Sequence, residues 1–152
     1  MRNAALLVLV CALMLLPMTL AGGERFDGNW MTKLVCPPKG STEGYTWKIP
    51  SVITANNFRG EHGTAGAPGY LLITGRIKED GTAKLAASGI VASRKYARGI
   101  FAAKGEEYSY DIKAQFRETE GIGTKSEGLG IVGRACTFEF VKLPGASKEG
   151  AN

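Results

Sequence analysis

Arg59, Glu61 and His62 are the residues of this chain whose types and spacing come nearest to acid–base chemistry. A histidine beside a carboxylate can act as a general base. Adjacent residues of a regular strand point to opposite faces, however, so Glu61 and His62 would not share one site. The sequence has no serine or cysteine in a nucleophile elbow, no second histidine and no motif around paired carboxylates. We therefore expect a protein that is not an enzyme, with His62 a solvent-facing structural residue. A hydrolase of unknown type is the alternative.

The N-terminal residues have the composition of a secretory signal peptide. Arg2 precedes an apolar stretch over residues 4–16, and small residues stand before and at Ala21, where a signal peptidase would cut. The stretch is shorter than the roughly 20 residues that a membrane-spanning helix needs, and Pro17 follows it. We expect residues 1–21 to be removed on export. The mature protein would then be periplasmic or secreted, with no membrane span.

Export leaves two cysteines, Cys36 and Cys136, because Cys11 lies in the signal peptide. In an oxidising compartment these two residues are expected to form a disulfide, and both lie on the apparent inward faces of their strands. Two free thiols are the alternative, but neither cysteine has a histidine or basic neighbour in sequence that would activate it. Two cysteines and one distant histidine do not make a zinc site, so we predict no metal and no cofactor.

A two-residue alternation of apolar and polar side chains recurs along the chain and predicts β-strands. It is clearest at residues 106–117, where two tyrosines, an isoleucine and a phenylalanine share one face. Further strands are predicted at residues 30–36, 45–49, 58–62, 70–77, 83–91, 122–126 and 134–143. Residues 93–105 break the alternation and indicate a longer connection with one helical turn. Pro50 is expected to bend the second strand or to place it at an edge.

Eight short antiparallel strands joined by sequential hairpins predict one all-β domain at residues 22–143, an up-and-down barrel followed by a disordered tail at residues 144–152. The mature chain of 152 − 21 = 131 residues leaves no room for a second domain. Closing the barrel removes exposed sheet edges and pairs the first strand with the last, where the two cysteines lie. A two-sheet β-sandwich is the alternative with the same pattern.

The charge pattern excludes one class of partner. The mature chain keeps 18 of the 19 basic residues against 14 acidic ones, a net charge of 18 − 14 = +4, with the two signs interleaved. A nucleic-acid binder would carry a basic stripe with aromatic stacking platforms. We therefore expect no nucleic-acid partner.

Aromatic residues with polar tips form the candidate binding site. A barrel of eight strands is either filled by its own side chains or holds one small ligand. Small inward residues on the strand at 83–91 would leave a cavity at one end, lined by Trp47, Tyr70, Tyr108 and Tyr110. Such rings suit a small apolar or amphipathic molecule. The alternative is that these rings fill the barrel.

A second functional hypothesis is a barrel that binds a protein partner in the cell envelope. Periplasmic inhibitors of secreted metalloproteases are exported eight-stranded barrels with one disulfide, and they insert an N-terminal arm into the protease cleft. Residues 22–27 would be an arm of that kind.

Three short segments resemble the calycin superfamily, which includes the lipocalins and avidins. The Phe-Asp-Gly-Asn-Trp sequence at residues 26–30 is similar to the Gly-x-Trp opening of the first calycin barrel strand, and residues 72–76 and 132–138 resemble the middle and last strands of avidin. In the avidin pattern an Asn stands two residues after that tryptophan and a Ser six after it, and both bind the biotin ureido group. This chain has Thr32 and Cys36 there, so biotin binding is not expected.

Most of the mature chain also resembles a group of small exported proteobacterial proteins of uncharacterised function. The resemblance is carried by Gly-Glu-His-Gly, Ala-Pro-Gly-Tyr, Asp-Gly-Thr-Ala, Tyr-Ser-Tyr and Cys-Thr-Phe-Glu-Phe at residues 60–63, 67–70, 80–83, 108–110 and 136–140. It implies no activity.

Overall fold

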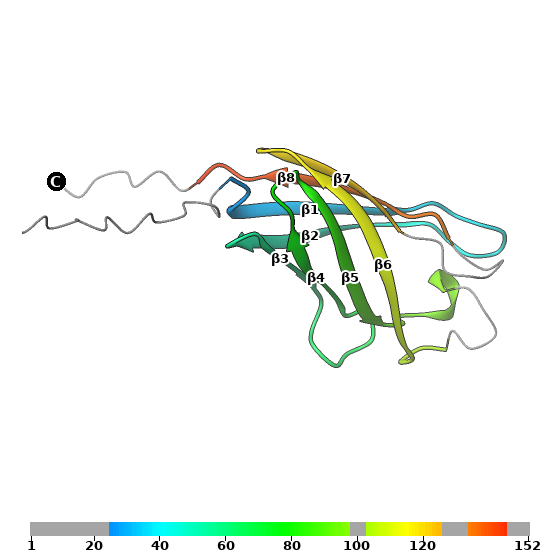
Figure 1. Ribbon diagram of the computed structural model, residues 1–152. Helices are drawn as coiled ribbons and strands as arrows, with labels where there is room; N and C mark the ends of the chain where they lie inside the picture. Colours follow the sequence, from blue (N-terminus) through cyan, green and yellow to red (C-terminus); the bar gives the residue numbers. More distant parts are fainter. Residues whose placement is uncertain (1–24, 98–102, 126–133, 146–152) are drawn as a thin grey trace, which may run out of the picture.

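The computed structural model describes residues 25–97, 103–125 and 134–145 of the 152-residue chain. In these residues eight strands form one closed antiparallel barrel (Figure 1). The strands are β1 (Gly28–Cys36), β2 (Tyr45–Thr54), β3 (Asn57–His62), β4 (Leu71–Ile77), β5 (Thr82–Ile90), β6 (Glu107–Phe116), β7 (Glu120–Lys125) and β8 (Thr137–Lys142). A single 3-10 turn, η1 (Arg94–Tyr96), follows β5. The predicted all-β barrel is confirmed, and the continuous pairing from β1 round to β8 excludes the sandwich.

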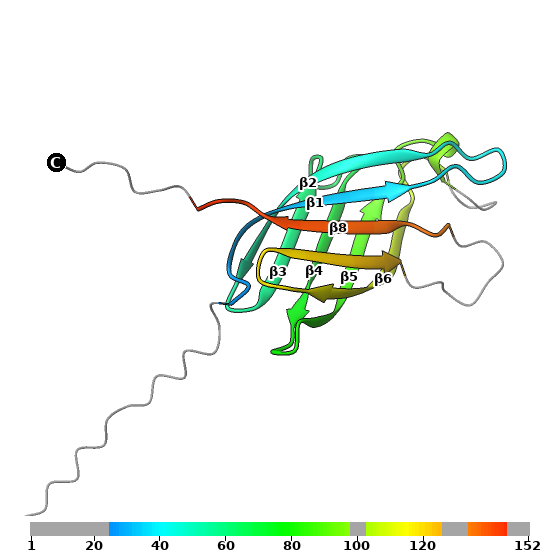
Figure 2. The same cartoon turned by 90° about the horizontal axis from the view of Figure 1, so that it is seen from above.

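The barrel closes along a ladder between β1 and β8, from the Trp30–Lys142 pair to the Val35–Thr137 pair. Continuing this register by one residue brings Cys36 opposite Cys136, and the two form a disulfide with their Cα atoms 4.3 Å apart. Figure 2 looks onto this seam, where β1 in blue and β8 in orange run side by side. The predicted disulfide therefore joins the first strand to the last at the line where the sheet closes.

The largest difference from the predicted strand boundaries is at Pro50. The second strand was expected over residues 45–49, but β2 continues through Pro50 to Thr54. Pro50 lies opposite Met31 of β1, whereas pairing with β3 begins only at Ser51. At Pro50, β2 is therefore paired with β1 but not with β3. A strand that is unpaired on one side tolerates a residue that cannot donate a backbone hydrogen bond.

Two of the predicted segments lie largely outside the described residues. These are the signal peptide at residues 1–21 and the tail, of which residues 144 and 145 are described and form no strand. Within the described ranges, no helix is long and apolar enough to cross a membrane.

Aromatic side chains fill one end of the barrel. The buried rings are those of Phe26, Trp30, Phe58, Phe116, Phe138 and Phe140, with neighbouring ring centroids 4.7 to 6.4 Å apart. The inward row of β7 carries glycines, and a Cβ added at Gly121 would come within 3.0 Å of the Phe116 ring. An added Cβ at Gly123 would lie 3.2 Å from the Phe140 ring. The rings therefore occupy the space that β7 leaves free.

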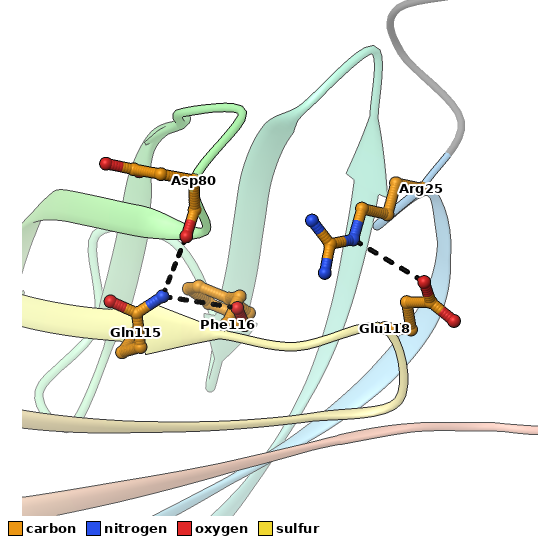
Figure 3. Close-up of polar contacts among 5 residues, drawn as sticks. All are labelled: Arg25, Asp80, Gln115, Phe116 and Glu118. Carbon is orange, nitrogen blue, oxygen red and sulfur yellow. Dashed lines mark hydrogen bonds and ion pairs between the residues drawn. The ribbon is translucent and has the colours of Figure 1, made fainter.

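The connections at this filled end are short hairpins held by polar contacts. Gln115 donates a hydrogen bond from Nε2 to the carbonyl of Asp80 at 3.0 Å, which joins β6 to the β4–β5 turn (Figure 3). Arg25 forms an ion pair with Glu118 at 3.6 Å, which joins the N-terminal segment to the β6–β7 turn. The filled end is thus closed by the turns as well as by the rings.

The described part of the proposed N-terminal arm is bound to the barrel. Phe26 is buried, and its carbonyl accepts a hydrogen bond from Trp30 Nε1 at 2.8 Å. The Asp27 carboxylate accepts hydrogen bonds from the backbone N–H groups of Ala55 and Asn56 at 2.7 and 3.1 Å, and both of these turn residues have positive φ. Residues 25–27 are therefore part of the barrel, and residues 22–24 lie outside the described residues.

The disulfide can be tested by the double substitution Cys36→Ala with Cys136→Ala. Because the bridge joins positions 100 residues apart, its loss should lower the free energy of unfolding by about 4 to 5 kcal/mol in the chain-entropy model, less any strain. Urea denaturation measures this difference. Reductant should destabilise the wild-type protein to the same extent and leave the double variant unchanged, and two titratable thiols in the untreated protein would contradict the bridge.

Candidate functional site

A pocket of about 370 Å³ lies at the end of the barrel opposite the filled end. The longer connections join the strands here, at residues 37–44, 63–70, 91–106 and 126–136, of which residues 98–102 and 126–133 are not described. We call this the open end. The pocket walls include Tyr45, Trp47, Tyr108, Tyr110, Lys125 and Arg134.

Three of the four sequence-predicted ligand-binding residues line this pocket. Trp47 reaches it from β2, and Tyr108 and Tyr110 reach it from β6. Tyr70 is not among the lining residues, because its hydroxyl donates a hydrogen bond to Glu61 at 2.7 Å. Glu61 also accepts a hydrogen bond from Arg59 at 2.8 Å, and these two bonds hold the pKa of the Glu61 carboxyl below its ordinary value. Tyr70 thus belongs to a polar cluster outside the pocket.

Small residues on β5 create the space for the two tyrosines of β6. The register places Ala87 opposite Tyr110 and Gly89 opposite Tyr108. A Cβ added at Gly89 would lie 2.5 Å from the Tyr108 ring and 2.6 Å from the Tyr70 carbonyl oxygen. As the sequence suggested, the small inward face of β5 accompanies a cavity at one end of the barrel.

Stacked rings form one side of the open end. The Trp47 ring lies 4.9 Å from the Tyr45 ring and 4.4 Å from His62, with the indole and imidazole planes 20° apart. The prediction that His62 faces solvent was therefore wrong. It belongs to the inward row of β3, and stacking on Trp47 leaves it half-buried. Glu61 and His62 do lie on opposite faces of β3, so they form no acid–base pair.

The connection after β1 and the turn η1 are held together at the pocket rim. The backbone N–H of Glu43 donates a hydrogen bond to the Lys95 carbonyl at 2.9 Å, and their side chains form an ion pair at 3.3 Å. The rings of Tyr45 and Tyr96 meet edge to face at 5.8 Å beside them. These contacts position Tyr96, a further lining residue.

Two basic residues of the pocket were missed by the sequence analysis. Arg134 is only 7% exposed and donates a hydrogen bond from Nη2 to the Glu43 carbonyl at 2.7 Å. Its guanidinium lies over the Tyr45 ring at 5.4 Å, and its Nη1 has no hydrogen-bond partner in the described part of the chain. Lys125 is half-buried, with Nζ 4.5 Å from the centroid of the Tyr110 ring.

The alternation of the strands carried a signal for both basic residues. Lys125 continues the inward row that contains Gly121 and Gly123, and Arg134 continues the row of Cys136 and Phe138. Extending each row by one step would have placed both side chains inside the barrel.

Burial shifts the pKa values of the side chains that line the pocket. It raises the pKa of the Tyr108 and Tyr110 phenols, and it also raises the pKa of Tyr45, an effect that the positive charge of Arg134 partly offsets. Burial, together with the nearby charge of Arg134, lowers the pKa of Lys125. The tyrosines therefore remain neutral hydrogen-bonding groups beside two cationic residues.

Among the described residues, no group of three or more histidine, cysteine, aspartate or glutamate side chains is placed to hold a metal ion. Comparison of the sequence with protein-family models and with curated proteins finds no match. The function is therefore argued from the geometry of the pocket.

The buried phenols predict a loss of stability at high pH. The pKa of Tyr110 is raised well above 10.0 in the folded protein. Above pH 10 the unfolded chain therefore binds fewer protons than the folded chain, so the free energy of unfolding falls as the pH rises. Urea denaturation from about pH 8 to about pH 11 measures this fall, which Tyr110→Phe should make shallower. The prediction fails if all five tyrosines of the folded protein ionise together with a midpoint near that of free tyrosine.

Proposed function

We propose that this protein is a non-catalytic binding protein that holds a small, partly apolar molecule in the pocket at the open end of the barrel. The observation that carries the proposal is the pocket of about 370 Å³ walled by aromatic side chains from β2 and β6. This volume lies within the range of roughly 300 to 1,000 Å³ that is usual for small-molecule sites, and such sites are mainly apolar with a few polar groups.

The chemistry of the walls supports a ligand with both apolar and polar parts. The flat faces of Trp47, Tyr108 and Tyr110 offer apolar contact area. The phenols are neutral across the physiological range, because their ordinary pKa is 10.0 and burial raises it further. They can therefore donate hydrogen bonds to a polar group of the ligand without adding charge.

We also propose that the protein works outside the cytoplasm, in the periplasm or as a secreted protein. The disulfide between Cys36 and Cys136 supports this location, because such bridges persist in oxidising compartments. The same proposal includes export through the predicted signal peptide. It also includes membership of the group of calycin-like exported proteins.

The protease-inhibitor alternative has less support. Its arm would consist of residues 22–27, but Phe26 is buried and Asp27 is bound to the β2–β3 turn. An arm that enters a protease cleft would have to release these contacts. Binding of a small molecule needs no such rearrangement.

A neutral fluorescent dye tests the proposal. N-phenyl-1-naphthylamine brightens in apolar surroundings, and its titration into the mature protein should give saturable binding. Replacing a wall ring, as in Tyr108→Leu or Trp47→Leu, should weaken binding about three- to tenfold, the range expected for loss of one aromatic contact. The matched control Tyr70→Leu removes a tyrosine outside the pocket and should leave the affinity unchanged. Absence of saturable binding, or equal losses in all three variants, would reject the pocket as the site.

Native mass spectrometry of the protein from the cells that produce it provides a second test. A retained ligand would appear as extra mass that is lost on denaturation, and the occupied fraction should fall in Tyr108→Leu but not in Tyr70→Leu. An equal occupied fraction in these two variants would place any retained molecule outside the pocket.

A further inference from the structure

The pocket contains two cationic side chains that no carboxylate neutralises in the described part of the chain. Among the described residues, six other basic side chains form ion pairs. Lys125 and Arg134 form none there. Two acidic residues, Glu106 and Glu107, also line the pocket, but both are exposed, and the Glu106 carboxylate accepts a hydrogen bond from the backbone N–H of Ala103 at 2.9 Å. The inner wall of the pocket is therefore positively charged.

The guanidinium of Arg134 is only partly hydrogen-bonded by the described residues. The Glu43 carbonyl occupies Nη2, and the Tyr45 ring lies under the guanidinium plane. Nη1 is buried without a hydrogen-bond partner among the described residues. Buried polar groups in folded proteins are almost always paired, because an unpaired donor loses its hydrogen bonds to water without replacement. Because Arg134 is a lining residue of the pocket, a ligand can supply a partner for its guanidinium.

The strand register brings Lys125 to the same place. The β7–β8 ladder pairs Thr124 with Thr137, and the Lys125 N–H donates to the Cys136 carbonyl at 3.0 Å. Arg134 stands two residues before Cys136 in the same inward row, so it is the diagonal neighbour of Lys125 across the two strands. One anionic group can therefore contact both cations.

We propose that the ligand is an amphipathic anion, with an apolar, preferably aromatic, body against Trp47, Tyr108 and Tyr110 and an anionic group bound by the Arg134 guanidinium and Lys125. This inference rests on the proposed function and names the class of ligand. A carboxylate, sulfonate or phosphate group has the required chemistry, since each accepts charge-assisted hydrogen bonds from a guanidinium and an ammonium group. Tyr110 contributes twice, because its ring faces the apolar body and also lies beside Lys125 Nζ.

The state of Lys125 agrees with this inference. Burial and the charge of Arg134 lower its pKa, so the two cations are in an unfavourable arrangement without a ligand. An anion between them would offset the repulsion and favour the ammonium form. An apolar ligand of the same shape would leave the repulsion in place.

Two dyes that differ by one sulfonate test the inference. N-phenyl-1-naphthylamine is neutral, and 8-anilino-1-naphthalenesulfonate adds a single negative charge to the same ring system. The wild-type protein should bind the sulfonate about tenfold or more tightly than the neutral dye, as expected for charge-assisted hydrogen bonds in a partly desolvated site.

Substitution of each cation separates its charge from the shape of the pocket. Lys125→Met should weaken sulfonate binding about fivefold or more and leave the affinity for the neutral dye unchanged or higher. Arg134→Lys keeps the positive charge but replaces the two terminal guanidinium nitrogens by a single ammonium nitrogen. It should also weaken binding of the sulfonate dye and not of the neutral dye. The matched control is Lys113→Met, which removes the same charge from the exposed outer face of β6. Thermal unfolding followed by circular dichroism checks that each variant is folded.

The head group is identified by competition. 2-Naphthoate, 2-naphthyl phosphate and the neutral 2-naphthylmethanol share one ring system, and each is titrated against the bound sulfonate dye. Stronger displacement by either anion than by the alcohol supports the inference, and the ranking of the two anions distinguishes a carboxylate ligand from a phosphate ligand.

The inference and the proposed function fail in different ways. If neither dye binds saturably, the small-molecule function itself is rejected. If the neutral dye binds as tightly as the sulfonate, if Lys125→Met weakens both dyes equally, or if the alcohol competes as well as the anions, the anionic ligand is rejected and the binding pocket stands.

Discussion

An antiparallel sheet of eight strands has two unpaired edges unless its first and last strands meet. In this protein β1 meets β8, although the chain between them spans most of the domain. Bringing such distant segments together costs chain entropy, and the disulfide between Cys36 and Cys136 reduces that cost by restricting the unfolded chain. Once the seam is closed, the inward rows of all eight strands face one another. The interior, including the pocket, exists only because of this closure.

The sizes of the inward side chains divide that interior into two parts. At the filled end, phenylalanine and tryptophan rings occupy the space left by the glycines of β7. At the open end, the small residues of β5 lie opposite Tyr108 and Tyr110, and a pocket remains between their rings and β2. The filled end contributes to the stability of the barrel, since its rings bury apolar area. The open end can therefore hold side chains that are poor core residues.

Lys125 and Arg134 are such residues. Lys125 is the last residue of β7 and Arg134 stands three residues before β8, and each rests against a tyrosine ring. Burying two like charges together is unfavourable in itself. An arrangement of this kind is typical of binding sites, where groups that would be costly in a core are matched by a ligand. The proposed class of ligand follows from the aromatic walls and the two cations together.

The strand pattern, the closed barrel and the pairing of the cysteines could be predicted from the sequence, because they follow from local alternation and from the chemistry of two residues. The residues that line the pocket were predicted only in part. Tyr70 was placed in the pocket and instead binds Glu61, while Lys125 and Arg134 were overlooked. Which faces meet depends on the register between strands distant in sequence, and a shift of one residue would exchange inside for outside. The sequence by itself therefore determined the barrel and its seam, and only the tertiary structure decided that two cations and five aromatic side chains share one pocket.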